Sequence, residues 1–216
     1  MVIDSRVSTA YRDRSPEMMH RIGVTIAKAL PSIPYGALLF FTQRDLMQRC
    51  LDAWGTAGII KTVNGKPILG GKPLYREGSD AKSNQEAVAR YKSATGTPQG
   101  AALACVFRGR NSEGSNFPDD QCRGIFLVGV PYANYSDPLV RAQIAFYDRR
   151  TTGLGNRWYT MDAFRAANQA LGRGIRSRDD WCKYWLLDHR YAQNENLISN
   201  WAKGAGPQII RTLTEK

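Results

Sequence analysis

Histidine and cysteine are scarce in this sequence of 216 residues. It contains two histidines, His20 and His189, and four cysteines, at positions 50, 105, 122 and 182. No two cysteines form a C-x-x-C pair, and two histidines are too few for us to expect a zinc site or a histidine-based catalytic triad. Cys50, Cys105 and Cys182 lie in apolar stretches, so we expect reduced core residues in an intracellular protein.

Long hydrophobic stretches are also absent. No segment approaches the roughly 20 apolar residues of a membrane-spanning helix, and residues 1–6 lack the apolar core of a secretory signal. We therefore expect no membrane partner and an intracellular location. The hydrophobic content of 43% and the charged content of 23% are ordinary for a globular protein. The length predicts one domain over residues 1–216, with 1–15 as a polar lead-in segment.

A phosphate-binding P-loop is missing as well. That motif requires G-x-x-x-x-G-K-[ST] after a strand. The nearest candidate, Gly55–Thr62, has Ile60 at the second glycine position and follows a predicted helix, while Gly70–Lys72 is followed by Pro73. We therefore do not expect the chain alone to bind ATP tightly or to hydrolyse it.

Positive charge, by contrast, is abundant. The chain has 30 lysines and arginines against 19 acidic residues, a formal net charge of +11. This excess indicates a polyanionic partner. Nucleic acid is favoured over a membrane, because no basic amphipathic helix with large apolar residues stands out.

Apolar runs and helical patterns alternate along the chain. Strands are expected at 37–41, 72–77, 101–107, 124–130 and 183–188, with possible short strands within 55–71. Helices are expected at about 16–30, 43–54, 82–93, 138–147, 160–176 and 195–203, the first with Ser15 as N-cap and Pro16 at N1. This alternation predicts an α/β fold with a mainly parallel sheet. Such sheets place ligands beyond the carboxyl ends of their strands.

Three polar loops follow predicted strands at Thr42–Arg44, Arg108–Asp120 and Pro131–Asp137. The second contains glycines, serines and two arginines, Arg108 and Arg110. Backbone amides of such a loop can cradle a phosphate, to which the arginines add charge. The alternative is an ordinary glycine-rich turn.

The segment Gln169–Arg176 carries the most distinctive pattern. We expect a helix that begins near Thr160 as its cap, with Asp162 in the first turn. Its buried stripe would comprise Phe164, Ala167, Leu171 and Ile175. Another face would carry Arg165, Gln169, Arg173 and Arg176, spaced i, i+4, i+8 and i+11.

Two readings of that face are open. It could be a solvated basic surface, or its arginines could bind phosphate oxygens, for which the guanidinium fork is suited. Gly172 and Gly174 beside the arginines cost helix stability, which indicates a position of close approach.

Several stretches, in their correct relative order, resemble the motifs of XPD-type superfamily 2 iron–sulfur DNA helicases. Gln169–Arg176 is similar to motif VI, Gly109–Phe117 to motif V and Gly36–Arg44 to motif IV. Gly124–Tyr132 and Leu187–Tyr191 resemble the strand ends that accompany them. The run from 158 to 181 is most similar to the FancJ/RTEL branch.

This resemblance implies a RecA-like second motor lobe of an ATP-dependent 5′–3′ DNA helicase, with helices on both faces of its sheet. ATP and Mg²⁺ would bind at a site shared with a first lobe, which carries the P-loop and the family's iron–sulfur cysteines and is absent from this chain. Arg173 and Arg176 would act as arginine fingers, and Gln169 would position water or relay the nucleotide state. Asn116 and Gly172 would lie on the nucleotide side.

The same resemblance implies that the lobe grips single-stranded DNA, in a protein of nuclear DNA repair. The residues that would contact the strand are Thr42, Gln43, Arg44, Arg108, Arg110, Ser112, Glu113 and Gly114.

The sequence departs from the family pattern at three places. Asn116 replaces an aspartate, Arg110 replaces a lysine, and Thr42–Arg44 replaces Pro-Ser-Tyr. The first and third departures favour an alternative, a non-catalytic nucleic-acid or protein-interaction module derived from a helicase lobe. A third possibility, an unrelated α/β enzyme, lacks support because no histidine can be placed near Ser112.

Overall fold

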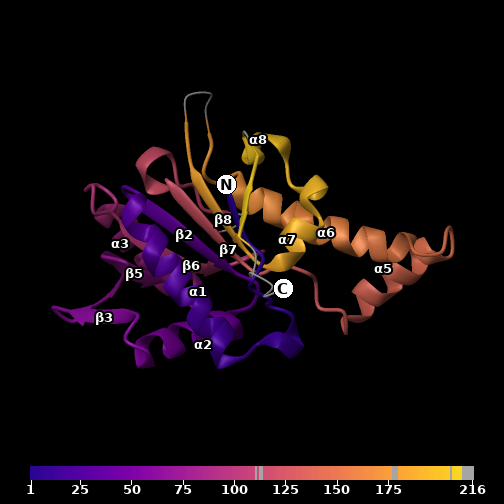
Figure 1. The fold of residues 1–216 in the computed structure, drawn as a ribbon, viewed down its shortest axis with the longest axis horizontal. Coiled ribbons are helices and arrows are strands. Elements are labelled where there is room, and N and C mark those ends of the chain that lie inside the picture. Colours follow the sequence, from indigo (N-terminus) through magenta and orange to yellow (C-terminus); the bar gives the residue numbers. More distant parts are fainter. Residues whose placement is uncertain (110, 112–113, 177–179, 205, 211–216) are drawn as a thin grey trace, which may run out of the picture.

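The computed structural model describes residues 1–109, 111, 114–176, 180–204 and 206–210 (Figure 1). Within them the strands are β1 (Val2–Asp4), β2 (Gly36–Phe41), β3 (Ile60–Val63), β4 (Lys66–Leu69), β5 (Lys72–Arg76), β6 (Ala101–Val106), β7 (Gly124–Val128), β8 (Lys183–Leu187) and β9 (Gln208–Ile210).

The helices of the same described residues alternate with these strands. The α-helices are α1 (Pro16–Ala29), α2 (Arg44–Thr56), α3 (Ala81–Ala94), α5 (Pro138–Asp148), α6 (Leu154–Leu171), α7 (His189–Gln193) and α8 (Asn200–Lys203). Short 3-10 turns are η1 (Tyr11–Asp13), η2 (Leu30–Ser32), η3 (Asp119–Gln121) and η4 (Glu195–Leu197). None of these helices is both long and apolar enough to cross a bilayer.

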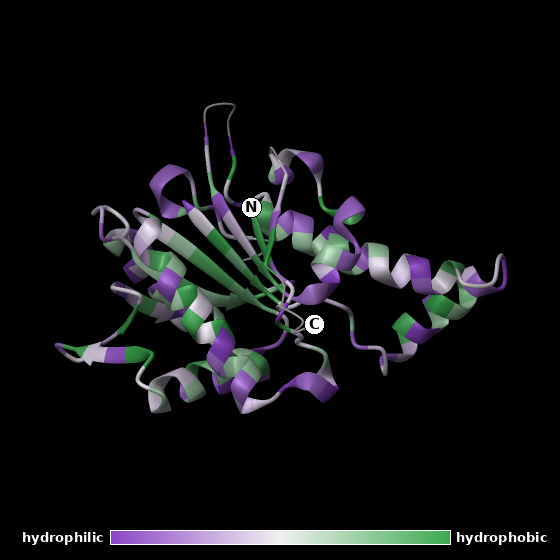
Figure 2. Cartoon of the chain, in the orientation of Figure 1, coloured by the Kyte–Doolittle hydropathy of each residue, from purple (hydrophilic) through white to green (hydrophobic). Residues whose placement is uncertain are grey.

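All the described strands belong to one sheet, in the order β3-β4-β5-β6-β2-β7-β8-β1-β9. From β5 to β9 in this order the strands are parallel to one another, whereas at one edge β4 pairs antiparallel with both β3 and β5. The central strand β2 is buried along its whole length, and Figure 2 shows the apolar character of the strands around it. Burial on both sides is expected of a parallel sheet covered by helices.

Helices cover both faces of the sheet (Figure 1). On one face α1 and α2 pack through Ile22, Ile26 and Trp54, among others. On the other face α3 and α6 contribute Tyr91 and Phe164 to a second core. The helix α5 is different, because none of its residues is buried and it packs mainly on α6 as an arm that projects from the body (Figure 1).

Most of the predicted elements are confirmed within a few residues. The start of α1 is as expected, since the Ser15 side chain accepts a hydrogen bond from the Met18 amide and Pro16 stands at N1. The expected tail helix is instead the 3-10 turn η4 followed by the short α8.

The N-terminal segment contributes more than a lead-in. Val2–Asp4 forms β1, which pairs with β8 on one side and with β9 on the other. Ile3 is fully buried. A three-residue strand carries too little pattern to be recognised from sequence, and it forms because neighbouring strands supply its partners.

The prediction for the helix before the arginines is wrong at both ends. The helix α6 begins at Leu154, after Gly153, so Thr160 and Asp162 lie inside it. The early turns are stabilised by α5, where Tyr147 stacks on Trp158 with centroids 5.7 Å apart. The helix ends at Leu171, so Arg173 and Arg176 are not on a helical face with Arg165 and Gln169.

The cysteines are free thiols. Cys50 and Cys105 are buried as expected, and so is Cys122, whereas Cys182 is only half-buried. Burial raises the pKa of Cys50 to about 12, so this thiol is inert as a nucleophile.

Candidate functional site

The loops predicted to carry function emerge at one edge of the sheet, because β2, β6 and β7 are parallel neighbours. Of the predicted strand-contacting residues, Arg110, Ser112 and Glu113 lie outside the described residues. Gly114 and Asn116 are described and exposed to solvent.

Arg44, the first residue of α2, is held by an internal acid. Its guanidinium donates to Glu77 Oε1 at 2.8 Å and to the carbonyl of Gly78 at 3.3 Å. The Glu77 side chain is only 4% exposed. Arg44 therefore closes onto the end of β5 instead of extending freely into solvent.

Glu77 in turn connects to the loop after β6. Its Oε2 accepts hydrogen bonds from the Val106 amide and from Asn111 Nδ2, both at 3.2 Å. The amide groups of Asn111 and Asn84 exchange hydrogen bonds of 2.9 and 3.3 Å, and both residues are buried. Ser115 Oγ donates to Asn111 Oδ1 at 2.9 Å.

This chain of contacts reaches the arginine turn. Arg173 Nη1 donates to the carbonyl oxygen of Ser115 at 2.9 Å. We call the connected set Arg44, Glu77, Asn84, Asn111, Ser115 and Arg173 the polar network. It links the residues after β2 and β6 to the turn after α6. Of its members, Glu77, Asn84, Asn111 and Ser115 were not predicted as site residues. A charged residue at the end of a predicted strand, as Glu77 is, was the one available signal.

The turn after α6 is anchored from both sides. Gly172 caps the helix, with its amide bonded to the Asn168 carbonyl. Gly174 fits against Cys182, since a Cβ built on Gly174 would lie 2.4 Å from the Cys182 sulfur. The close approach of Cys182 therefore explains why position 174 is a glycine. No comparably close neighbour would explain the glycine at position 172.

An ion pair between Arg123 and Asp180 fixes the segment around Arg176. Asp180 accepts hydrogen bonds from the Arg123 guanidinium and, at 3.0 Å, from the Arg176 amide. Burial opposes the ionisation of Asp180, but these hydrogen bonds hold its pKa below the ordinary value. The backbone of Arg176 is thus fixed while its side chain is exposed. Among the described residues, no acidic group forms a salt bridge with its guanidinium.

Gln169 is exposed on α6 and lines a shallow hollow of about 470 Å³ with Arg165 and Trp201. Arg108 is tied to α6 at another point, where its Nη2 contacts Asp162 Oδ2 at 2.5 Å and approaches the Pro131 carbonyl at 3.5 Å.

Thr42 and Gln43 line a more enclosed pocket of about 600 Å³ beyond the ends of β2 and β7. We call it the tyrosine pocket. Its lining comprises Thr9, Ala10, Tyr11, Arg14, Thr42, Gln43, Val130, Tyr132, Ala133, Asn134, Tyr135, Ser136, Tyr159 and Arg190. Thr42 and Gln43 were predicted as site residues and Pro131–Asp137 as a polar loop after a strand, but an aromatic pocket was not predicted.

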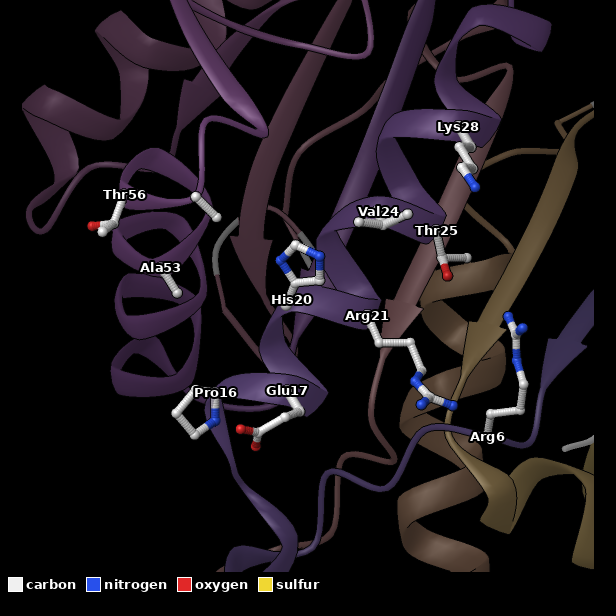
Figure 3. Close-up of a pocket in the computed structure, with 11 residues that line it drawn as sticks. Arg6, Pro16, Glu17, His20, Arg21, Val24, Thr25, Lys28, Ala53 and Thr56 are labelled. Atoms are coloured by element: carbon white, nitrogen blue, oxygen red, sulfur yellow. The ribbon is translucent and has the colours of Figure 1, made fainter.

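A second hollow, of about 830 Å³, lies between α1 and α2 and contains none of the predicted site residues. Figure 3 shows Arg21, Thr25 and Lys28 projecting from one side of α1 toward Arg6. Arg6 is itself paired with the buried Asp4 at 2.7 Å. This groove is open and basic, and it has no link to the polar network among the contacts of the described residues.

No cluster of three or more histidine, cysteine, aspartate or glutamate side chains suited to a metal ion occurs in the described ranges. The described residues therefore offer no set of ligands for a resident metal.

Comparison with known proteins identifies the chain. The family model of the helicase C-terminal domain matches residues 26–205. Regulator of telomere elongation helicase 1 of Mus musculus is 34% identical over 92% of this chain. The homologue of that helicase in Drosophila willistoni is 31% identical over 93% of the chain.

Solved structures give the same fold. An apo XPD structure matches 97% of this chain with a TM-score of 0.66 and 21% identity, and 39% of that protein is covered. The structure of S. tokodaii Xpd4 also matches 97% of the chain, with a TM-score of 0.66, 17% identity and 38% of that protein covered. The predicted RecA-like fold is confirmed.

The chain spans only 17% of the mouse relative and 21% of the Drosophila willistoni relative. Within that span, the resemblance to the second lobe of XPD-type helicases, on the RTEL side, is confirmed. The chain belongs to the helicase C-terminal domain family.

Proposed function

We propose that the chain is the second motor lobe of an ATP-dependent 5′–3′ DNA helicase. ATP and Mg²⁺ would bind chiefly to a first lobe that this chain does not contain, and that lobe would also hold the family's iron–sulfur cluster. The observation that carries the proposal is the polar network, because it connects the loops that would grip DNA to the turn that would reach ATP.

The two arginines have different roles in this proposal. Arg176 is exposed beside a backbone fixed by Asp180, so its side chain is the better arginine finger. Arg173 is half-buried and bonded to Ser115, which suits a residue that senses nucleotide and transmits the state to the motif V loop. Gln169 would position water or relay that state, and Asn116 and Gly172 would lie on the nucleotide side.

Single-stranded DNA is the proposed substrate, within a nuclear protein acting in DNA repair. The strand would be gripped by Thr42, Gln43, Arg44, Arg108, Arg110, Ser112, Glu113 and Gly114. Closing of the two lobes around ATP would then move the lobe along the strand.

A specific observation favours the rival function, a non-catalytic interaction module. Arg44 and Arg108 are engaged by Glu77 and Asp162, at 2.8 and 2.5 Å, and these bonds compete with a DNA phosphate. The two proposals differ in what Arg176 does, so the decisive experiment concerns that residue.

The first test uses the lobe joined to a first lobe that carries a P-loop. The Arg176→Ala variant should lower kcat for ATP hydrolysis by about 10³-fold or more, as loss of an arginine finger does. Arg165→Ala, an exposed arginine of α6, should leave kcat nearly unchanged. Equal rates for Arg176→Ala and the wild type would support the interaction module instead, and ATP hydrolysis by the chain alone would refute the shared site.

The second test measures binding of the chain to labelled single-stranded DNA across a salt series. Affinity should fall steeply with salt, and Arg110→Ala should weaken it and flatten the salt dependence by about one unit of slope. Arg149→Ala, on the projecting arm, is the matched control. If Arg110→Ala binds the strand as tightly as the wild type does, the motif V loop does not contribute to DNA binding.

A further inference from the structure

The tyrosine pocket has features that the motif comparison does not account for. It opens at the carboxyl edge of the sheet, between the loop after β2, the segment between β7 and α5, and the N-terminal segment around Tyr11. Its volume of about 600 Å³ is within the range of pockets for small organic groups.

Aromatic rings form much of the wall. The rings of Tyr132 and Tyr159 are 5.0 Å apart between centroids, and Tyr135 meets Tyr159 edge-on at 5.8 Å. Tyr135 is 61% exposed and Tyr11 is 86% exposed, so both retain ring surface that no protein group covers in the described structure. The Tyr159 hydroxyl is fixed by a hydrogen bond to the Ala133 carbonyl, which holds its ring in place.

Positive charge lies beside the rings. The Arg14 guanidinium is 5.8 Å from the Tyr11 centroid and donates to Gln43 Oε1 at 2.8 Å and to the Thr9 carbonyl at 3.1 Å. The Arg190 guanidinium is 5.4 Å from the Tyr132 centroid. Burial lowers the pKa of Arg14, but a guanidinium stays charged at neutral pH.

Thr42, one of the residues that line the pocket, has an unpaired polar atom. Thr42 Oγ1 is buried and has no hydrogen-bond partner among the described atoms. Gly129 (φ +87°) lies against it, with a built Cβ 3.0 Å from Thr42 Cγ2 and 2.3 Å from Thr9 Oγ1. A buried hydroxyl without a partner is unfavourable.

We propose that the tyrosine pocket takes one unstacked base of the DNA strand, with the strand's phosphate beside Arg14. This proposal rests on the proposed function, since the strand must first be bound. An aromatic wall stacks any base, and a cation attracts the backbone. A purely phosphate-binding groove would need the cations but not the tyrosines.

The test compares two strands of equal length, labelled oligothymidine and the same backbone made of abasic sites. Fluorescence anisotropy with the full chain should give tighter binding to the strand that has bases. Tyr135→Ala and Tyr11→Ala should each weaken binding of oligothymidine by about tenfold and leave the abasic strand unaffected. Tyr135→Phe, which keeps the ring, should bind as the wild type does.

Phe146→Ala is the matched control, because Phe146 is an aromatic residue 50% exposed on the arm, outside the pocket lining. Equal affinity for both strands, or wild-type binding of oligothymidine by both alanine variants, would overturn the pocket proposal and leave the strand grip intact. If neither strand binds, the proposed grip itself fails, and the pocket proposal fails with it.

Discussion

The polar network begins at the same edge of the sheet as the tyrosine pocket, yet the two are built in opposite ways. In the network, buried polar groups find partners within the chain, as Glu77 and Asn111 do. In the pocket, Thr42 Oγ1 is buried without a partner and tyrosine rings remain uncovered. A closed network suits the transmission of a conformational state, whereas an open pocket suits the capture of a ligand.

The largest change in stability is expected at Asp188, which follows β8 and holds two residues of the tyrosine pocket lining, Thr9 and Arg190. Its carboxylate accepts hydrogen bonds from the Thr9 amide at 2.9 Å and from the Arg190 guanidinium at 2.7 and 2.8 Å. Asp188→Asn leaves Arg190 without its counter-charge, so it should lower the free energy of unfolding by about 3 kcal/mol at pH 7. Urea denaturation measures this change, and Asp52→Asn, at an exposed acid of α2, is the control.

The same carboxylate predicts a pH dependence. Burial opposes the ionisation of Asp188, but Arg190 holds its pKa below the ordinary value. A depressed folded-state pKa contributes stability above the unfolded pKa of about 3.9, and this is lost as pH falls through the folded value. The wild type should therefore lose stability below about pH 4 more steeply than Asp188→Asn. Parallel pH profiles would show that the pair is not coupled to folding.

A smaller effect is expected in the polar network. Glu77→Ala removes the acceptor of Arg44, Asn111 and the Val106 amide, so buried donors lose their partner. We expect a loss of about 2 kcal/mol in the free energy of unfolding. In a two-lobe protein, the variant should also reduce the stimulation of ATP hydrolysis by DNA. If DNA stimulates ATP hydrolysis by the variant as strongly as by the wild type, the network does not couple DNA binding to hydrolysis. Glu86→Ala, at an exposed acid of α3, is the control.

The smallest change in stability is expected when the Thr42 hydroxyl is removed. Thr42→Val keeps the shape of the side chain and removes the unpaired hydroxyl, so the free energy of unfolding should rise by about 1 kcal/mol. Binding of single-stranded DNA should become weaker at the same time. Thermal unfolding and anisotropy on one preparation test both changes. Lower stability in this variant would mean that the hydroxyl has a partner and that the pocket resembles the network.

Local signals in the sequence were sufficient for some elements. Ser15 and Pro16 predicted the start of α1, and the apolar run of β2 predicted a strand buried on both faces. The ordered motifs predicted the family and the fold. The start of α6 could not be predicted, because it depends on the packing of Trp158 against α5 rather than on Thr160 as a cap.

The candidate site was predicted only in outline. The loops after β2 and β6 were identified, but not that Arg44 pairs with Glu77, since that contact joins residues 33 positions apart. The tyrosine pocket was missed because its aromatic residues come from η1, the segment after β7 and α6, which no local pattern connects. The helical face proposed for Arg173 and Arg176 was wrong because α6 ends at Leu171.

The pairing of β1 with β9 has a mechanical consequence. These strands come from opposite ends of the described chain and run parallel, with Val2 beside Gln208 and Asp4 beside Ile210. Tension applied to the chain before Val2 and after Ile210 would pull the two strands in opposite directions along their length. The hydrogen bonds between them would then be loaded together in shear rather than opened one by one from an end. A lobe tied in this way can bear force between the segments on either side of it while its sheet keeps its shape.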